Sequence, residues 1–333
     1  MLPSASVIMA VYNGEPHVRE AVDSILAQSL ANLELIVVDD ASTDATWRVL
    51  AGCHDSRLRV LRNPSRLGAA AARNRAIQVA QAPLIAIQDA DDVSLPQRLQ
   101  MQAEFLGRNP SVDLVGAWAI SISHGGREIG LLSYPPRTDL NLKWALLFWN
   151  PFIHSSVMLR RSMLAKVGSY REGRGPAWFV EDYELFSRVA RLHQAANIGQ
   201  ALIKYRVHPA GASARHADLL RFSEEVSLNN VKWLLGGKGI DEEAVHALRR
   251  FWFEEKSLSA ADAWHALTCS GILQRAFLAR YVEHRVRRIP RARFYLGCAR
   301  RALAQARNNS HLDRSCRAAM LRSVLSLAAR AVA

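Results

Sequence analysis

The stretch Glu34-Leu35-Ile36-Val37-Val38-Asp39-Asp40-Ala41-Ser42-Thr43-Asp44 decides the fold of this 333-residue chain. Its apolar run over residues 35–38 predicts a β-strand, and the Ser, Thr and Asp that follow can cap a helix starting near Ala45. A wholly apolar strand that leads directly into a helix is typical of a parallel sheet with helices on both faces. The stretch therefore indicates an α/β protein.

The same alternation of strand and helix patterns continues on both sides of this stretch. We predict a Rossmann-like, mostly parallel sheet, whose ligand lies at the carboxyl ends of the strands. The other strands expected in this region are residues 6–11, 57–62 and 84–87, and the expected helices are residues 16–28 and 69–80.

The pattern changes after about residue 110. Two strand-like segments flank His124-Gly125-Gly126 and predict a hairpin, and Pro209 and Gly211 later interrupt the pattern before a helical region. We predict one domain over residues 1–210 and a helical, Arg-rich extension over residues 211–333. The remaining expected elements are strands 112–123, 127–132 and 198–207 and helices 139–148 and 182–192.

Basic residues outnumber acidic residues, 43 against 30, so the formal net charge is +13. Residues 271–333 hold 14 arginines and two acids, which gives this tail +12 and leaves +1 for the rest of the chain. The function of residues 1–270 therefore need not be explained by their charge.

The four cysteines are scattered, without a CxxC pair or a nearby histidine at metal spacing. This pattern argues against a zinc site or a disulfide framework. No stretch reaches 18 apolar residues, and the N-terminus lacks the basic flank of a signal peptide. We expect a cytoplasmic protein without a membrane span.

Polar side chains follow three of the predicted strands. Tyr12 and Asn13 follow the first strand, Asp39 and Asp40 the second, and Asp89-Ala90-Asp91-Asp92 the fourth. A single glycine follows the first strand in place of a GxGxxG motif, which disfavours a dinucleotide oxidoreductase. Carboxylates gathered at strand ends suit a hard divalent cation.

Four segments, in their order and spacing, resemble family 2 glycosyltransferases of the GT-A fold over about residues 5–210. They read VIMAVYN at 7–13, ELIVVDDASTD at 34–44, QDADD at 88–92 and EDYEL at 181–185. The resemblance implies transfer of a sugar, with inversion, from a nucleotide diphosphate-sugar to an acceptor hydroxyl. We expect a UDP-sugar donor, a saccharide or lipid-linked acceptor, and a role in the synthesis of cell-surface polysaccharide or glycolipid. A divalent metal can offset the charge on the leaving diphosphate, and a carboxylate can take the hydroxyl proton.

Asp89 and Asp91 form the DxD pair of this resemblance. We assign Asp91 to a divalent cation, Mn²⁺ or Mg²⁺, and Asp89 to the ribose or the metal's water shell, because alternate residues at a strand end can converge on one ion. The alternative is that both acids cap the helix after Pro96. His208 lies where many GT-A enzymes place a metal-binding histidine, although a histidine after a strand is often structural.

The ends of the first two strands are where family members hold the base and ribose. Tyr12 can stack on the base, Asp40 can accept a hydrogen bond from a pyrimidine N–H, and Asn13 lies beside them. In the alternative interpretation, Tyr12 is a half-buried core residue, Asn13 is a turn residue and Asp40 caps a helix. Arg73 lies in a segment that is similar to the family's Gly-to-Arg-Asn segment. We expect it to contact the base or the diphosphate of the donor, and the alternative is a solvated helix arginine.

Asp182 is the predicted general base, since the second acid of the family's Glu-Asp motif faces the acceptor. Apolar neighbours can shield its carboxylate and raise its proton affinity, and both acids can also cap the helix that follows. Glu181, Trp178 and His154 are expected on the acceptor side, with a core position as the alternative for Trp178.

The basic tail has several interpretations. Residues 320–330 form an amphipathic helical pattern. Such a helix can pack on the body, pair with another subunit, or lie on the anionic inner membrane leaflet. The alternative is a basic face that is simply exposed to solvent. The rival functions are a sugar-phosphate nucleotidyltransferase and a non-enzymatic nucleic-acid-binding protein. The Gly-rich, basic loop that a nucleotidyltransferase would normally carry after its first strand is absent from this sequence. Few aromatic residues accompany the arginines of the tail, so we expect no nucleic-acid partner. The oligomeric state cannot be read from the sequence.

Overall fold

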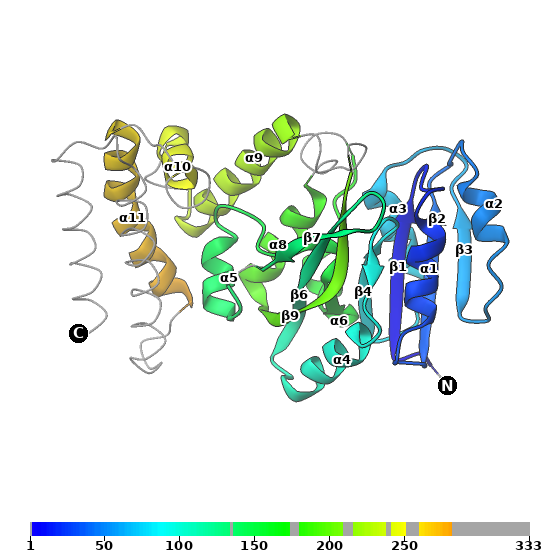
Figure 1. Cartoon of the computed structure of the whole chain (residues 1–333). Coiled ribbons are helices and arrows are strands. Elements are labelled where there is room, and N and C mark those ends of the chain that lie inside the picture. Colours follow the sequence, from blue (N-terminus) through cyan, green and yellow to red (C-terminus); the bar gives the residue numbers. More distant parts are fainter. Residues whose placement is uncertain are drawn as a thin grey trace. The chain divides into compact units, whose positions relative to one another are not determined.

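The computed structural model describes residues 2–133, 136–173, 180–208, 216–237, 241–250 and 260–281 (Figure 1). These residues form two compact units. The first comprises Met1–Leu142 and Asn150–Phe222, and the second comprises Lys143–Trp149 with the described residues from Ser223 onward. The predicted domain boundary after residue 210 lies outside the described residues and stays a prediction.

The N-terminal half of the first unit is a parallel sheet in the order β3-β2-β1-β4. The apolar residues of β1 and β2 are almost completely buried, as a strand covered on both faces requires. The predicted α/β fold is confirmed. The strands are β1 (Ala5–Val11), β2 (Leu33–Asp39), β3 (Leu58–Arg62) and β4 (Leu84–Asp89).

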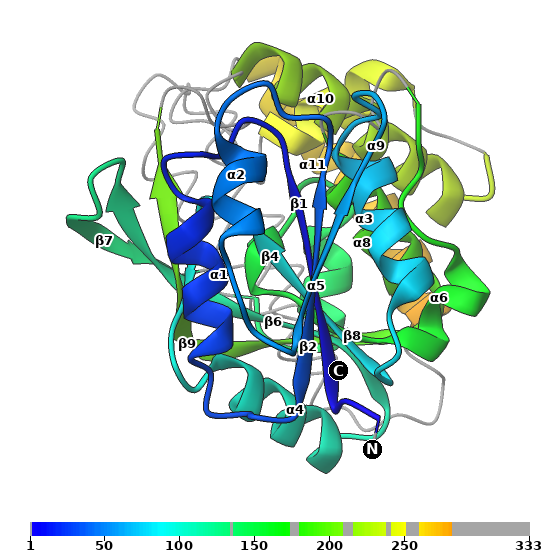
Figure 2. The ribbon, with the colours of Figure 1, turned by 90° about the vertical axis from the view of Figure 1, so that its right-hand side faces the viewer.

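Helices cover both faces of these strands. Figure 2 shows α1 and α2 on one side of β1 and β2, with α3 on the other. Val18, Val22 and Ile25 of α1 lie in the core together with strand residues, so the predicted apolar face is the buried face. The helices are α1 (Val18–Leu26), α2 (Thr46–Ala51) and α3 (Ala69–Val79).

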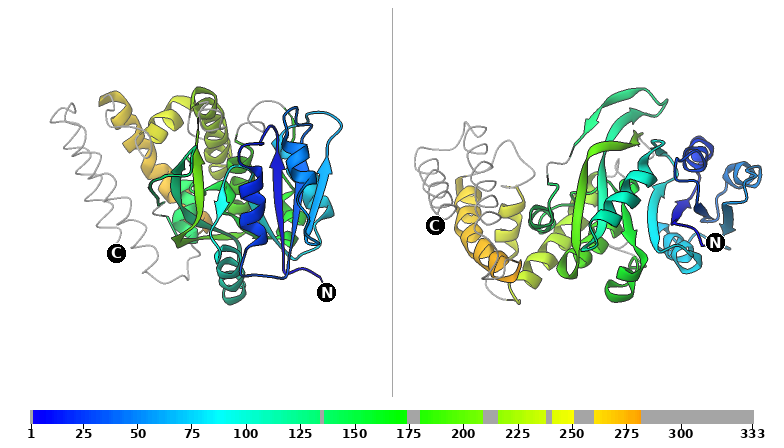
Figure 3. Two further views of the ribbon diagram at one scale, coloured as in Figure 1. Left: turned by 45° about the vertical axis from the view of Figure 1, so that its right-hand side comes forward. Right: turned by 90° about the horizontal axis from the view of Figure 1, so that it is seen from below.

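The sheet continues from β4 in the order β8-β6-β9-β5, and β7 pairs with β6. The predicted hairpin around His124 is present and projects beyond the sheet (Figure 3). The strand predicted at 198–207 begins at Gln194. The three-residue strand β8 was not predicted, because it is too short to show a period. The elements are β5 (Val93–Ser94), α4 (Arg98–Arg108), β6 (Val112–Ser123), β7 (Glu128–Leu132), α5 (Asp139–Ala145), η1 (His154–Ser156), β8 (Met158–Arg160), α6 (Arg161–Val167), α8 (Glu181–Leu192) and β9 (Gln194–Val207).

The second unit is helical, as predicted for this part of the chain. Trp144 and Phe277 pack edge to face with ring centroids 5.2 Å apart, and the Ser227 hydroxyl donates to the Leu147 carbonyl at 2.7 Å. No described helix is both long and apolar enough to cross a membrane. Most of the basic tail, from residue 282, lies outside the described residues. The helices here are α9 (His216–Leu234), α10 (Glu242–Arg249) and α11 (Ala260–Tyr281).

Candidate active site

The strand order locates the candidate site. In the sheet, β2 lies on one side of β1 and β4 lies on the other side. Because the strand order reverses direction at β1, a crevice is expected at the carboxyl ends of β1 and β4. Tyr12 and Asn13 follow β1 directly, and Asp91 follows β4 by two residues. The sheet thus brings together the strand-end residues that the sequence singled out.

Asn13 ties the loop after β1 to the loop after β2. Its backbone has a positive φ of 52°, its side-chain oxygen accepts a bond from the Thr43 N–H at 2.9 Å, and its own N–H donates to the Ser42 hydroxyl at 3.0 Å. Asparagine tolerates this left-handed conformation better than most residues. The turn alternative for Asn13 is therefore present in the structure, and its ligand role stays a prediction.

Asp40 is buried and holds the loop that precedes α3. Its carboxylate accepts bonds from the Asn63 side-chain amide at 2.7 Å, the Leu67 N–H at 2.9 Å and the Gly68 N–H at 2.7 Å. Gly68 has a φ of 98°, which only glycine adopts readily. The carboxylate therefore shapes the wall of the crevice, and its bond to a base stays a prediction.

Tyr12 is 36% exposed, and the guanidinium carbon of Arg66 lies 3.9 Å from its ring centroid. Such a cation–π contact stabilises the ring's orientation modestly. Arg66 was not predicted, because the contact joins residues 54 positions apart and depends on the loop that Asp40 holds.

Arg73 joins two of the predicted acids. Its guanidinium donates to Asp89 Oδ1 at 2.8 Å and to Glu181 Oε1 at 2.6 Å, and the arginine side chain is only 8% exposed. His154 Nδ1 lies 3.4 Å from the same Asp89 oxygen, and Asp182 is next to Glu181 at the start of α8. We call Arg73, Asp89, His154, Glu181 and Asp182 the buried half of the site. Arg73 is therefore not a solvated helix residue.

The electrostatics of the buried half separate its two aspartates. Burial alone would raise the pKa of Asp89, but His154 and Arg73 outweigh it and hold that pKa below the ordinary value. Burial and the neighbouring charge of Glu181 raise the pKa of Asp182, against the lowering effect of His154. Asp89 is thus held ionised, while Asp182 has a higher proton affinity than an ordinary carboxylate.

Asn150 fixes the carboxylate of Asp182. Its side-chain amide donates to Asp182 Oδ2 at 2.8 Å, and the Tyr183 N–H donates to Oδ1 at 2.7 Å. The second bond satisfies an N–H in the first turn of α8, so the predicted capping role coexists with the predicted chemical one. Asn150, 32 positions before Asp182, was not among the predicted site residues. Trp178, predicted beside this acid, lies outside the described residues.

His154, predicted on the acceptor side, is anchored at both ring nitrogens. Besides Asp89, its imidazole hydrogen-bonds through Nε2 to the hydroxyl of the buried Tyr170 at 2.9 Å. Tyr170 was not predicted. The imidazole therefore lies against the buried half, and its contact with an acceptor stays a prediction.

Asp91 lies in more open surroundings. Its side chain is 36% exposed, and its Oδ2 is 2.9 Å from His208 Nε2. The rings of His17 and His124 have centroids 5.7 and 5.8 Å from that of His208, and they approach each other through Nε2 and Nδ1 at 3.1 Å. We call Asp91, His208, His17 and His124 the open half. His17 and His124 were not predicted, since they reach this place from α1 and from the β6–β7 turn.

Arg206 holds the backbone of the open half through hydrogen bonds. Its Nε donates to the Asp91 carbonyl at 2.8 Å, and its terminal nitrogens donate to the His124 carbonyl at 2.8 Å and to Glu20 at 2.6 Å. Asp92 is completely buried, accepting from the Arg206 N–H and the Ser155 hydroxyl. Asp92 is therefore a structural residue of the turn.

The donor set of the open half suits a hard cation bound together with a ligand. Among the described residues, no group of three or more His, Cys, Asp or Glu side chains is arranged as a complete metal centre. Asp91 and His208 supply one carboxylate and one imidazole at contact distance. Magnesium and similar ions are commonly held by one or two carboxylates, substrate phosphates and water, which such a pair would fit.

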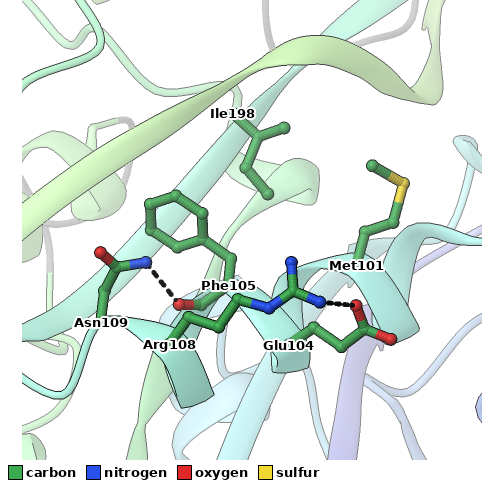
Figure 4. A pocket seen from close by; sticks show the side chains of 6 residues that line it. All are labelled: Met101, Glu104, Phe105, Arg108, Asn109 and Ile198. Atoms are coloured by element: carbon green, nitrogen blue, oxygen red, sulfur yellow. Dashed lines mark hydrogen bonds and ion pairs between the residues drawn. The ribbon is translucent and has the colours of Figure 1, made fainter.

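A shallow pocket also lies on α4 and the start of β9 (Figure 4). Met101, Phe105 and Ile198 form its apolar wall, and Glu104, Arg108 and Asn109 line the rest, with Glu104 and Arg108 paired at 3.0 Å. None of the strand-end residues lines it, so it is separate from the candidate active site.

Known proteins match this chain, and a family model covers the part of the site from Tyr12 to His154. The sequence model of Glycosyl transferase family 2 matches residues 6–168. WfgD of Escherichia coli, described as a UDP-Glc:alpha-D-GlcNAc-diphosphoundecaprenol beta-1,3-glucosyltransferase, is 37% identical over 212 residues, which cover 63% of this chain and 79% of that protein.

Solved structures with low sequence identity share the fold. The structure of S. aureus TarS 1-349 in complex with UDP-GlcNAc matches 98% of this chain and 90% of its own, with a TM-score of 0.59 and 17% identity. The mannosyltransferase PcManGT from Pyrobaculum calidifontis, in complex with GDP-Man and Mn²⁺, matches 100% and 88%, with a TM-score of 0.54 and 20% identity. The fold is therefore GT-A, and the sequence matches show that this chain belongs to glycosyltransferase family 2.

Proposed function

We propose that this chain transfers a sugar, with inversion, from a UDP-sugar to a hydroxyl of a saccharide or lipid-linked acceptor, in the synthesis of cell-surface polysaccharide or glycolipid. The name of the E. coli relative, a glucosyltransferase with a UDP-glucose donor and a diphosphoundecaprenol-linked acceptor, supports this donor and acceptor class. The TarS complex with UDP-GlcNAc supports a uridine diphosphate donor for this fold.

The observation that carries the proposal is the geometry of the buried half, in which Arg73 joins Asp89 at the end of β4 to Glu181, the neighbour of Asp182. A base is most useful when its pKa approaches the working pH, and burial moves Asp182 in that direction. Asn150 and the Tyr183 N–H fix the orientation of the carboxylate. Asp182 is our proposed general base.

The reaction that we propose uses one proton transfer and one displacement. The carboxylate of Asp182 takes the proton of the acceptor hydroxyl, and the hydroxyl oxygen attacks the anomeric carbon of the donor from the face opposite the diphosphate. The bond from that carbon to the diphosphate oxygen breaks, and its electron pair leaves with the diphosphate. The configuration of the sugar is thereby inverted.

Two sets of residues would serve the donor. Asp91 and His208 would hold a divalent cation, Mn²⁺ or Mg²⁺, which when bound offsets the charge of the leaving diphosphate, with Asp89 near the ribose or the metal's water shell. Tyr12, Asn13 and Asp40 line the proposed base and ribose site. Arg73, which is paired with Asp89 and Glu181, is proposed to contact the donor from the buried half.

The test is a panel of UDP- and GDP-sugars with Mn²⁺ or Mg²⁺, scored for metal-dependent hydrolysis and thermal shift in the wild type and in Asp91→Ala. We expect a UDP-sugar to stabilise the wild type in the presence of metal, and Asp91→Ala to lose the metal-dependent part. Absence of any shift or hydrolysis with every nucleotide-sugar and with free UDP and GDP would overturn the proposal.

We also propose that the basic tail holds the protein on the cytoplasmic side of an anionic membrane. Residues 271–333 carry +12, and a basic residue near an anionic surface contributes about 1 kcal/mol. The full chain should sediment with vesicles that contain anionic lipid at low salt, and release at high salt. Equal recovery with neutral and anionic vesicles would contradict this location.

A further inference from the structure

A buried polar network lies beneath the turn that carries Asp89 and Asp91. It consists of Gln88, Ser94, Arg98 and Gln102, and each of these residues is at most 4% exposed. Polar groups at such depth are costly unless every one is hydrogen-bonded. The bonds of this network therefore show which backbone groups it holds in place.

Gln88 spans the turn with one side-chain amide. Its Nε2 donates to the carbonyl of Asp92 at 2.8 Å and to the carbonyl of Asp89 at 3.1 Å. Its Oε1 accepts from Arg98 and from the Ser94 hydroxyl, both at 2.8 Å. Both ends of the amide are thus engaged, and the amide cannot flip without losing all four bonds.

Arg98 locks Gln88 from the other side. Its guanidinium donates to Gln88, to Ser94 at 2.8 Å, to the Ile87 carbonyl at 2.6 Å and to Gln102 at 3.1 Å. Burial lowers the pKa of Arg98 to about 9, while Asp92 and Asp89 act in the opposite direction. The charge lies at the base of an acidic turn, where those carboxylates favour it.

The carbonyls of the turn are held from two sides. Gln88 holds those of Asp89 and Asp92, and Arg206 holds that of Asp91 at 2.8 Å. Because the side chains of Asp89 and Asp91 leave the same short turn, a rotation of its peptide planes would displace both carboxylates together. The backbone of the turn is therefore held by Gln88 and Arg206, while Arg73, His154 and His208 contact the carboxylates themselves.

We propose that Gln88, locked by Arg98, is a positioning residue that aims the carboxylates of Asp89 and Asp91 at the donor and its metal. The inference rests on the proposed function of the same site. It assigns no contact with substrate to Gln88 or Arg98, since both are completely buried.

The network contains its own matched control. Gln102 is also completely buried, accepts from Arg98 through its Oε1, and donates through Nε2 to two backbone carbonyls, those of Ser156 at 2.7 Å and Val115 at 3.3 Å. None of its partners belongs to residues 89–92. Gln88→Met and Gln102→Met each remove one buried amide, one bond to Arg98 and two bonds to carbonyls; Gln88→Met also removes the bond from the Ser94 hydroxyl, and only this variant frees the turn.

The experiment compares these two variants of the full chain. Mn²⁺ affinity is measured by electron paramagnetic resonance with UDP as the probe ligand, and unfolding is followed in urea. Residues that orient metal ligands typically contribute about tenfold to a hundredfold in affinity. We expect Gln88→Met to weaken Mn²⁺ binding in the presence of UDP at least about tenfold, with Gln102→Met within about twofold of the wild type at comparable loss of stability.

A second pair of variants keeps the test decisive if the methionine variants do not fold. Gln88→Glu and Gln102→Glu retain the side-chain shape and an acceptor for Arg98, but the ionised carboxylate cannot donate to the carbonyls. The same difference is expected, with Gln88→Glu the weaker binder. Equal Mn²⁺ affinities within either folded pair would overturn the inference.

The outcomes also separate this inference from the proposed function. If the wild type binds Mn²⁺ and UDP, and Gln88→Met and Gln102→Met bind them equally, the positioning role is wrong and the proposed function is untouched. If the wild type binds neither UDP nor GDP with Mn²⁺, the proposed function and the inference are overturned together.

Discussion

Asp89 and Asp91 lie two residues apart on one turn, yet their side chains differ in exposure and in ion-pair partners. Asp89, in the buried half, is 24% exposed and is paired with Arg73 and His154. Asp91, in the open half, is 36% exposed and its carboxylate is paired with His208. The turn that follows Asp89, the last residue of β4, sends the two side chains into different surroundings, although alternate residues of a continued strand would share one face.

The difference indicates a division of labour. In the buried half, one arginine lies between two carboxylates, and these ion pairs hold the three groups in a fixed geometry. In the open half, Asp91 and the three histidines come from separate segments of the chain, and the Asp91 side chain is 36% exposed. We expect changes in the buried half to affect chemistry and stability, and changes in the open half to affect ligand binding.

Asp182→Asn is the largest expected effect. Asparagine keeps the size of the side chain and can still accept the Tyr183 N–H, but it cannot take a proton from the acceptor. General base catalysis is worth about 10² to 10⁴ in rate, so kcat should fall about 10³-fold while the Kd for UDP stays within about threefold. Steady-state kinetics and titration calorimetry measure both, and a kcat within tenfold of the wild type would remove Asp182 from its proposed role.

Arg73→Met should destabilise the fold of the buried half. The substitution leaves Asp89 and Glu181 without their shared cation, and loss of one partner of a buried ion pair costs about 3–5 kcal/mol. The control is Arg19→Met, which breaks an exposed pair with Asp23 and should cost far less stability. Urea unfolding measures the free energy of unfolding of both variants. Similar losses of stability would mean that the ion pairs of Arg73 contribute no more than an exposed pair.

His208→Ala should separate ligand binding from stability in the open half. The imidazole is one of two groups proposed to hold the metal, so its loss should weaken Mn²⁺ binding in the presence of UDP at least about tenfold. The free energy of unfolding should change by less than about 1 kcal/mol, because the partner Asp91 keeps access to water. Unchanged Mn²⁺ affinity would show that His208 is structural.

The pH dependence should follow Asp182 and not Asp89. The base must be ionised, so kcat/KM should fall about tenfold per pH unit below its pKa, which burial raises above the ordinary 3.8. Asp89 stays ionised through the same range because its pKa is lowered. Circular dichroism at each pH checks that the fold persists. An acid limb with its midpoint at or below 3.8 would contradict the raised pKa of the base.

The sequence predicted the parallel half of the sheet well, and the physical reason is local. A strand buried on both faces must be wholly apolar, and the helices that cover it must show one apolar stripe, so both patterns are written in consecutive residues. The strand β8 carries no such pattern in three residues. The extra residues at the start of β9 pair with β6, and that pairing is not a local property.

The candidate site was predicted where its residues follow strands or lie in segments that carry the family resemblance. Tyr12, Asp40, Asp89 and Asp91 could be named because strand ends are predictable. Their partners Arg66, Arg206, His17 and His124 could not, since each arrives from another element. Membership of the glycosyltransferase family agrees with the leading interpretation over the nucleotidyltransferase and nucleic-acid alternatives.

By itself, the sequence determined the order of strands and helices from β1 to β4, the acids at the strand ends and the concentration of positive charge after residue 270. Only the tertiary structure decided which acids are paired and which are left open to a ligand. The physical reason is that burial and ion pairing depend on side chains far apart in the chain. Asp89 meets Arg73, 16 residues before it, whereas Asp91 meets His208, 117 residues after it.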